Sequence, residues 1–176
     1  SYVEILDSLG AKVVVRVPHN PSGEATWTPI AQQLKNAGVK ALSFSGVPEV
    51  AAQLMKAFDE LGWKPNITLL DGGFYADVLI SRAGSSAEGT VVRTSYAMLE
   101  EADKVKAVAD YLNMMKTYNS DGKIAALGMQ TTSSYLLFAT AAKTCIEANG
   151  GTLDRACVMA EAKKVTSWTG GGPVSY

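Results

Sequence analysis

The sequence predicts an α/β protein in which a parallel sheet is flanked by helices. Three observations favour this class: short β-branched runs alternate with segments of helical periodicity, the connections between them are short, and Gly or Pro stands at most boundaries. Parallel strands require crossover connections, and right-handed crossovers place helices against the sheet.

The chain has 176 residues, of which 47% are hydrophobic and 19% charged, so it can form one domain or two small lobes with a real core. A formal charge of −1 argues against a basic surface for nucleic acid. No apolar run is long enough to predict a membrane span. Because the chain starts at Ser1, we expect it to be processed or to be part of a longer protein.

Residues 12–17 (KVVVRV) form a β-branched run between a glycine and a proline, which predicts the first strand. The first helix is predicted to begin at Thr28, because a capping residue followed by Pro29 is typical of a helix start. Its apolar residues recur at helical spacing until Gly38 ends the helix. A second strand, residues 39–45, follows directly.

Pro48 opens a second helix, whose apolar residues keep a helical period up to Gly62. Residues 66–70 (NITLL) predict a third strand. After a glycine-rich turn, residues 75–82 predict a short helix, and residues 90–94 (TVVRT) predict the fourth strand.

The second half of the chain is predicted to be mostly helical. Residues 100–118 predict an amphipathic helix with acidic residues near its start, where they favour the positive end of the helix dipole. A strand at residues 124–127 and a long Ala-rich helix at residues 130–148 follow. Asp154 is expected to cap a shorter helix, residues 155–165.

The common catalytic and phosphate-binding motifs are absent from the sequence. It contains no G-x-G-x-x-G, no G-x-x-x-x-G-K-[ST] and no G-x-S-x-G. His19, the only histidine, lies in a Pro/Asn/Ser/Gly loop, where we expect a solvated side chain without a catalytic role. A structural zinc needs about four Cys or His ligands, and the chain has two Cys and one His. No metal and no cofactor is therefore expected.

Three loops follow predicted strands at the carboxyl edge of the sheet, where ligands bind in open α/β folds: residues 18–24, 46–48 and 71–74. Asp71 comes directly after a buried strand in a glycine-flanked turn. A carboxylate there, with Phe74 beside it, suits a small cationic group. The alternative is that Asp71 only hydrogen-bonds its own turn, and position alone does not separate the two.

Cys145 and Cys157 flank a Gly-Gly turn between two predicted helices. Their spacing permits a disulfide across the turn in an oxidising compartment. It equally permits two buried free thiols.

The stretch LKNAGVKALSFSGVPEVAAQLMKAFDELGWKPNITLLDGG, together with the later SSAEGTVV, resembles the substrate-binding proteins of branched-chain amino acid ABC transporters. TSSYLLFATAAKTC is similar to the long Ala-rich helix of that family. The resemblance covers nearly the whole chain and implies the type I periplasmic-binding-protein fold. That fold is a bilobal Venus flytrap, which closes about a hinge on a small solute without catalysis.

Family members are substantially longer, so the resemblance implies that most of the N-terminal lobe lies outside this chain. It assigns residues 1–92 to most of the C-terminal lobe and residues 93–96 to a hinge crossing. Residues 97–168 would be a C-terminal contribution to the N-terminal lobe, and residues 169–176 would begin the last hinge crossing.

In family members that bind amino acids, an acid of the C-terminal lobe holds the ammonium group and aromatic residues contact the side chain. The acid position matches Asp71 or Gly72, whereas the aromatic positions match non-aromatic residues here. Because the aromatic contacts are absent, the expected ligand is another amino acid, an amide or a different small solute. The candidate ligand-binding residues are Gly46, Val47, Asp71, Gly72, Phe74, Met129 and Gln130.

The resemblance also implies partners and a location. The expected partners are a small-molecule ligand, an ABC transporter permease and the missing N-terminal part, which could be a separate chain; nucleic acid is not expected. A periplasmic or extracellular protein is expected, with a lipid anchor at the missing N-terminus as one option. Family versions with two cysteines around this turn favour the disulfide. Two alternatives stay open: a ligand-sensing receptor ectodomain of the same fold, and an α/β enzyme.

Overall fold

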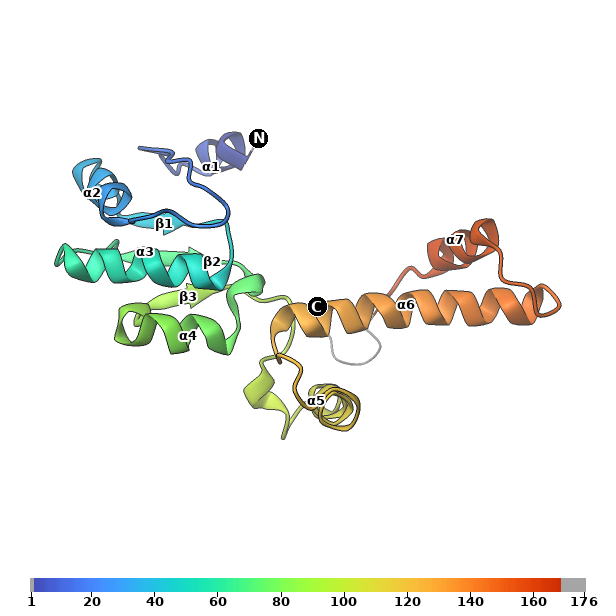
Figure 1. Ribbon diagram of the computed structural model, residues 1–176. Coiled ribbons are helices and arrows are strands. Elements are labelled where there is room, and N and C mark those ends of the chain that lie inside the picture. Colours follow the sequence, from blue (N-terminus) through green and yellow to red (C-terminus); the bar gives the residue numbers. More distant parts are fainter. Residues whose placement is uncertain (1, 169–176) are drawn as a thin grey trace. The chain divides into compact units, whose positions relative to one another are not determined.

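The computed structural model describes residues 2–168, and residues 169–176, the expected start of the last hinge crossing, lie outside the described residues. The chain divides into two compact units, Ser1–Arg93 and Thr94–Tyr176. The first unit contains the β-sheet, and the described part of the second is built from helices (Figure 1).

The first unit is a parallel sheet with helices between its strands, which confirms the predicted fold class. The three strands have the order β1-β2-β3, and Ser43 and Leu69 are paired in register, as are Leu69 and Val91. In chain order the elements are α1 (Tyr2–Ser8), α2 (Thr28–Asn36), β1 (Ala41–Ser43), α3 (Pro48–Glu60), β2 (Ile67–Leu70), the 3₁₀ turn η1 (Gly72–Phe74), α4 (Asp77–Ala83), the 3₁₀ turn η2 (Gly84–Ala87) and β3 (Thr90–Val92).

The helix boundaries of this unit follow local sequence signals. A proline stands in the first turn of both α2 and α3, where its missing N–H has no helical partner to lose. Gly38 and Gly62 follow these helices with φ angles of 68° and 56°, in the left-handed region that glycine adopts without a steric penalty. The predicted helix starts and stops are confirmed here to within two residues.

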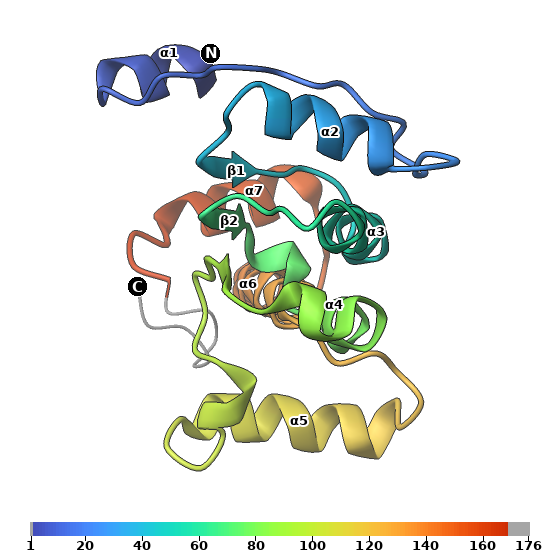
Figure 2. The ribbon, with the colours of Figure 1, turned by 90° about the vertical axis from the view of Figure 1, so that its left-hand side faces the viewer.

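The core of the first unit lies between one face of the sheet and the helices. Figure 2 shows α3 and α4 on the same side of the strands. The buried residues include Trp27, Leu34, Phe44, Leu54, Phe58, Leu70, Phe74 and Leu79. On the opposite face, Ile67 is 51%, Leu69 39% and Val91 51% exposed. Since parallel sheets are normally covered on both faces, this apolar face lacks its usual second layer in the described chain.

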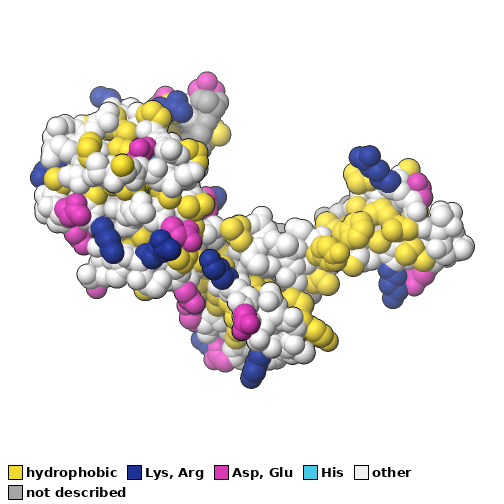
Figure 3. Space-filling view, in the orientation of Figure 1, with side chains coloured by type: hydrophobic (Ala, Val, Ile, Leu, Met, Phe, Trp, Pro, Cys, Tyr) yellow, Lys and Arg dark blue, Asp and Glu magenta, His cyan; other side chains and the backbone are white. Residues whose placement is uncertain are grey.

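The second unit consists of the 3₁₀ turn η3 (Leu99–Glu101) and the helices α5 (Lys106–Tyr118), α6 (Ala126–Ala148) and α7 (Arg155–Lys164). Helices α6 and α7 pack through Ala141, Ala142, Cys145 and Val158. Hydrophobic side chains also gather on the outer surface of α6 and α7 (Figure 3), and Tyr135, Phe138 and Met159 are among those exposed.

The strand predicted at residues 12–17 is wrong for the described chain: no residue in it belongs to a strand. Val13, Val15 and Val17 are half-buried and alternate with exposed neighbours, and the last two pack against the core. The segment therefore has the side-chain pattern of a strand, but a strand also needs a hydrogen-bonded partner, and no described strand pairs with it. Helix α1 had no counterpart among the predictions.

Three further predictions are corrected in their bounds. The first helix of the second half begins at Lys106, because Val105 before it is extended. Glu100 and Glu101 belong instead to η3. There Glu101 Oε2 accepts a hydrogen bond from the Met98 amide at 2.9 Å. The strand predicted at residues 124–127 is wrong, since α6 already begins at Ala126; short apolar runs do not separate strand from helix. Helix α4 begins two residues later than predicted.

Candidate functional site

The candidate residues of the first unit lie at the carboxyl ends of β1 and β2. Gly46 and Val47 follow β1, and Asp71 begins the segment that follows β2. Because β1 and β2 are neighbouring parallel strands, both segments emerge at the same edge of the sheet. The backbone thus places these residues where open α/β folds bind ligands.

The Asp71 carboxylate caps the turn that it opens. Its Oδ1 accepts a hydrogen bond from the Gly73 amide at 2.8 Å, and Asp71 is the N-cap of η1, with Gly72 as the first residue of that turn. The turn contact expected from the sequence is therefore present. The side chain is exposed, and Oδ2 makes no hydrogen bond to the described residues, so one carboxylate oxygen is available to a cationic group.

Phe74, the last residue of this turn, anchors it in the core of the first unit. Its side chain is only 1% exposed and belongs to the core, where its ring meets that of Phe44 edge-on with centroids 5.9 Å apart. In this unit the Phe74 ring positions the turn and does not stand at the surface.

An aromatic cluster that sequence analysis missed joins the three loops at this edge. His19 stacks on Phe44 with ring centroids 4.9 Å apart, and Trp27 packs against both rings. His19 Nε2 lies 3.0 Å from the Ser45 carbonyl oxygen. His19 is thus half-buried and holds the loop of residues 18–24 against the end of β1, so its side chain is less solvated than expected.

Gly46 is required by this cluster. A Cβ atom at this position would lie 2.8 Å from Cε1 of Phe44, closer than side chains tolerate. Val47 follows with an exposed side chain at the N-cap of α3. The sequence signals for this arrangement are weak: His19 closely follows a β-branched run, and Phe44 lies near the end of a predicted strand.

Met129 and Gln130 belong to the second unit, in the first two turns of α6. Met129 is completely buried, whereas the Gln130 side chain is exposed. Gln130 is therefore the more accessible of the two to a solute.

Close to these residues, Tyr111 of α5 packs against the first turn of α6. Its side chain is buried, and its hydroxyl makes no hydrogen bond within ordinary geometric limits to the described residues. A Cβ atom on Gly128 would lie 2.2 Å from that hydroxyl oxygen. Burial raises the pKa of Tyr111 above its ordinary value, and the nearby backbone of Ala125 opposes this in part.

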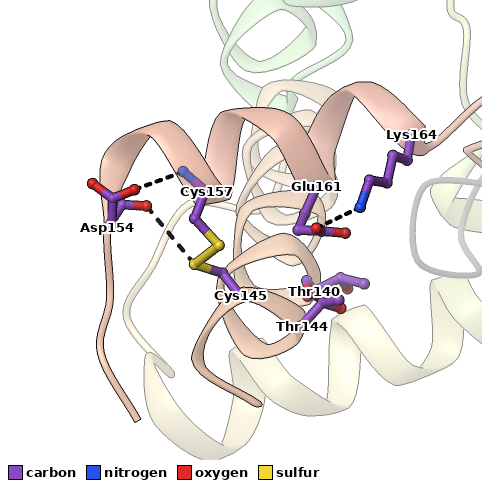
Figure 4. A network of polar contacts seen from close by, with 7 residues as sticks. All are labelled: Thr140, Thr144, Cys145, Asp154, Cys157, Glu161 and Lys164. Carbon is purple, nitrogen blue, oxygen red and sulfur yellow. Dashed lines mark hydrogen bonds and ion pairs between the residues drawn. A yellow bond between two sulfur atoms is a disulfide. The ribbon is translucent and has the colours of Figure 1, made fainter. Parts of the chain in front are cut away.

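The two cysteines form a disulfide, as the resemblance implied, and the free-thiol alternative is wrong. Cys145 and Cys157 join α6 to α7 with 5.7 Å between their Cα atoms (Figure 4). Beside the bridge, Asp154 Oδ2 accepts a hydrogen bond from the Cys157 amide at 2.9 Å and caps α7, as predicted.

A surface hollow of about 400 Å³ lies between α3 and α4, lined by Glu49, Gln53, Lys56 and Arg82 among others, and none of the candidate residues lines it. Within residues 2–168, no group of three His, Cys, Asp or Glu side chains could hold a metal ion. None of the described helices combines the length and the apolar character needed to cross a membrane.

A family model described as "Periplasmic binding protein" matches residues 1–175. Among solved structures, a leucine-binding protein from Thermotoga maritima is similar, with a TM-score of 0.77 and 21% sequence identity over 98% of this chain. A branched-chain amino acid ABC transporter protein from Thermus thermophilus with bound valine has a TM-score of 0.78 and 19% identity over 98% of this chain. A search of curated protein sequences found no match.

The chain spans less than half the length of these two solved structures, 46% of the first and 45% of the second. At such identities the similarity establishes the fold.

Proposed function

Because the chain belongs to the periplasmic binding protein family, we propose that it is part of an extracytoplasmic solute-binding protein that delivers an amino acid or a similar small polar solute to an ABC transporter. The observation that carries this proposal is the family match over residues 1–175. The leucine-binding protein and the valine-bound protein among the similar structures favour an amino acid as the ligand class. We propose no catalytic role.

The lobe assignment implied by the resemblance is part of the proposal. Residues 1–92 would form most of one lobe, residues 93–96 would cross the hinge, and residues 97–168 would contribute to the other lobe. The division of the chain into two compact units after Arg93 supports this assignment. Lobe closure on the solute is then the step that the transporter recognises.

Within the first lobe, Asp71 is the residue proposed to bind the solute's ammonium group. Its Oδ2 has no described hydrogen-bond partner, and the turn amide on Oδ1 fixes the orientation of the carboxylate. Gly46, Val47 and Gly72 would form the rim beside it, with Phe74 behind the turn. In the second unit, Met129 and Gln130 remain the candidate residues, and the exposed Gln130 is the one that a solute could reach. An ammonium–carboxylate hydrogen bond contributes about 1.5–3 kcal/mol, enough to select charged amino groups.

The missing N-terminal part of the protein, in the same or a separate chain, is proposed to complete both units. The apolar sheet face with Ile67, Leu69 and Val91, and the exposed Tyr135 and Phe138 of α6, are surfaces that it would cover. The periplasm or the cell exterior is the proposed location, and the disulfide between α6 and α7 fits an oxidising compartment.

Titration of the isotope-labelled chain with valine, leucine and a panel of other amino acids tests the proposal by nuclear magnetic resonance. Amide shifts should concentrate in residues 71–74. Asp71→Asn keeps the oxygen that accepts from Gly73 but loses the charge, so binding should weaken roughly 10-fold or more. Asp77→Asn, an exposed acid in the first turn of α4, is the matched control and should leave binding unchanged.

Native mass spectrometry of the purified, non-reduced sample complements this titration. A complex with a second polypeptide plus a small extra mass supports a binding protein assembled from two pieces. If neither the chain nor such a complex responds to any amino acid, in shifts or in melting temperature, the proposed ligand class is wrong.

A further inference from the structure

Asn149 and Gly150, at the end of α6, form a pair whose chemistry is independent of solute binding. We propose that Asn149 is a site of spontaneous deamidation, which converts its side-chain amide into a carboxylate. The chain contains six asparagines, and Asn149 alone is followed by glycine. Glycine favours the reaction because no Cβ hinders its backbone nitrogen as a nucleophile.

The reaction needs no partner other than water. The backbone nitrogen of Gly150 attacks Cγ of Asn149, a new C–N bond forms, and the bond from Cγ to Nδ2 breaks. Nδ2 takes up the amide proton and leaves as ammonia, which closes a five-membered succinimide. Water then opens this ring at the side-chain carbonyl to give aspartate, or at the backbone carbonyl to give isoaspartate.

The structure holds the two reacting groups only weakly. The Gly150 amide donates no hydrogen bond to the described residues, although the amides of Asn149, Gly151 and Thr152 all do. Asn149 Nδ2 makes one long contact, 3.4 Å to the Thr152 carbonyl oxygen. Asn149 is exposed and non-helical, with φ −116° and ψ 32°, and a Cβ atom added to Gly150 would meet nothing within 4 Å beyond the adjoining residues. Because both residues are exposed, we expect no packed neighbour to block the backbone rotation that brings this nitrogen to Cγ.

Asn119 offers a matched comparison within the same chain. It is the C-cap of α5, as Asn149 is the C-cap of α6, and it too is exposed. The next residue is Ser120, whose Cβ hinders the attack. If a helix end alone decided the reaction, both asparagines would convert, whereas the proposal predicts conversion of Asn149 only.

Deamidation would alter the connection between α6 and α7. It adds a negative charge at the C-terminal end of α6, where the helix dipole is also negative, two residues after the exposed Glu147. The isoaspartate product also lengthens the backbone inside the loop closed by Cys145 and Cys157. We therefore expect the modified protein to melt at a lower temperature than the fresh protein.

The test is prolonged incubation of the folded, disulfide-intact chain at mildly alkaline pH, followed by proteolysis and mass spectrometry. The peptide with Asn149 should gain the mass difference between a hydroxyl and an amino group, and isoaspartate should appear in it. The peptide with Asn119 should stay unchanged. Asn149→Gln should abolish the gain, and Asn119→Gln should leave it as it was.

A parallel incubation in urea after reduction measures how fast the unfolded chain reacts, and the folded sample shows whether the fold permits the reaction. Conversion in the folded chain supports the proposal, whatever its rate relative to the unfolded chain. The proposal is overturned if Asn149 keeps its amide in the folded chain, whether or not the unfolded chain reacts. Equal conversion of Asn119 and Asn149 would overturn it as well.

Discussion

Substitution of Gly128 by alanine tests the packing of Tyr111 against α6. On helix propensity alone, Gly128→Ala should stabilise α6 by about 1 kcal/mol. In the structure, however, the new methyl group would lie 2.2 Å from the Tyr111 hydroxyl oxygen and 3.3 Å from Cζ. Overpacking of this kind costs about 1–3 kcal/mol, so we expect a net loss of about 1 kcal/mol in the free energy of unfolding.

A double-mutant cycle with Tyr111→Phe tests this reasoning, because the second substitution removes the oxygen atom that the new methyl group would meet. Tyr111→Phe deletes a buried hydroxyl that has no hydrogen-bond partner among the described residues, so alone it should be neutral or slightly stabilising. In the Tyr111→Phe background, Gly128→Ala should no longer destabilise and should gain up to about 1 kcal/mol from helix propensity. The expected coupling energy is about 2 kcal/mol, within the range of residues in contact.

Urea unfolding of the native chain, the two single variants and the double variant measures this cycle, with circular dichroism as the readout and the disulfide intact. Hydrogen exchange of the α6 amides localises the effect to the second unit. If Gly128→Ala changes stability equally in both backgrounds, the Tyr111 hydroxyl does not lie against Gly128 and the packing described here is wrong.

Three further predictions concern the second unit. Burial raises the pKa of Tyr111 above 10.0, so the unfolded chain loses the hydroxyl proton at a lower pH than the folded chain. The contribution of Tyr111 to the free energy of unfolding is therefore complete below pH about 10 and falls at higher pH. Measured at increasing alkaline pH, the free energy of unfolding should fall more steeply for the native chain than for Tyr111→Phe. Replacing both cysteines, Cys145→Ser with Cys157→Ser, should lower the free energy of unfolding by about 3 kcal/mol, the value for a disulfide that closes a short loop. Amides of α7 should lose protection from hydrogen exchange. An unchanged melting temperature would contradict this prediction. Asp154→Ala should cost about 1 kcal/mol by removing the cap of α7, whereas Asp154→Asn should cost little, a contrast that thermal unfolding can measure.

Much of the fold follows from signals within a few residues. Pro29 and Pro48 mark helix starts, Gly38 and Gly62 mark helix ends, and the Asp154 carboxylate caps the helix that it was expected to cap. These signals are local because they depend on φ angles and on the unpaired amides of one helical turn. Strand pairing does not depend on local signals alone, as residues 12–17 show. Their β-branched composition favours a strand, but a strand forms only where a neighbouring strand, distant in the sequence, provides hydrogen-bond partners.

The candidate site was predictable in its position and not in its packing. Asp71 could be placed at the end of a strand, and its capping contact is a short-range feature. The stacking of His19 on Phe44, and the burial of Phe74 beneath the turn, depend on how loops far apart in sequence meet. No periodicity or motif encodes such contacts.

The α/β class, the order of most elements and the resemblance to a binding-protein family could all be predicted from the sequence, because hydrophobic periodicity and turn chemistry act over short stretches of chain. Three features could be seen only in the folded chain: Phe74 is a core residue, Gly46 makes room for Phe44, and the Tyr111 hydroxyl lies against Gly128. Each of these depends on side chains from separate elements filling one space, and close packing is a property of the assembled core.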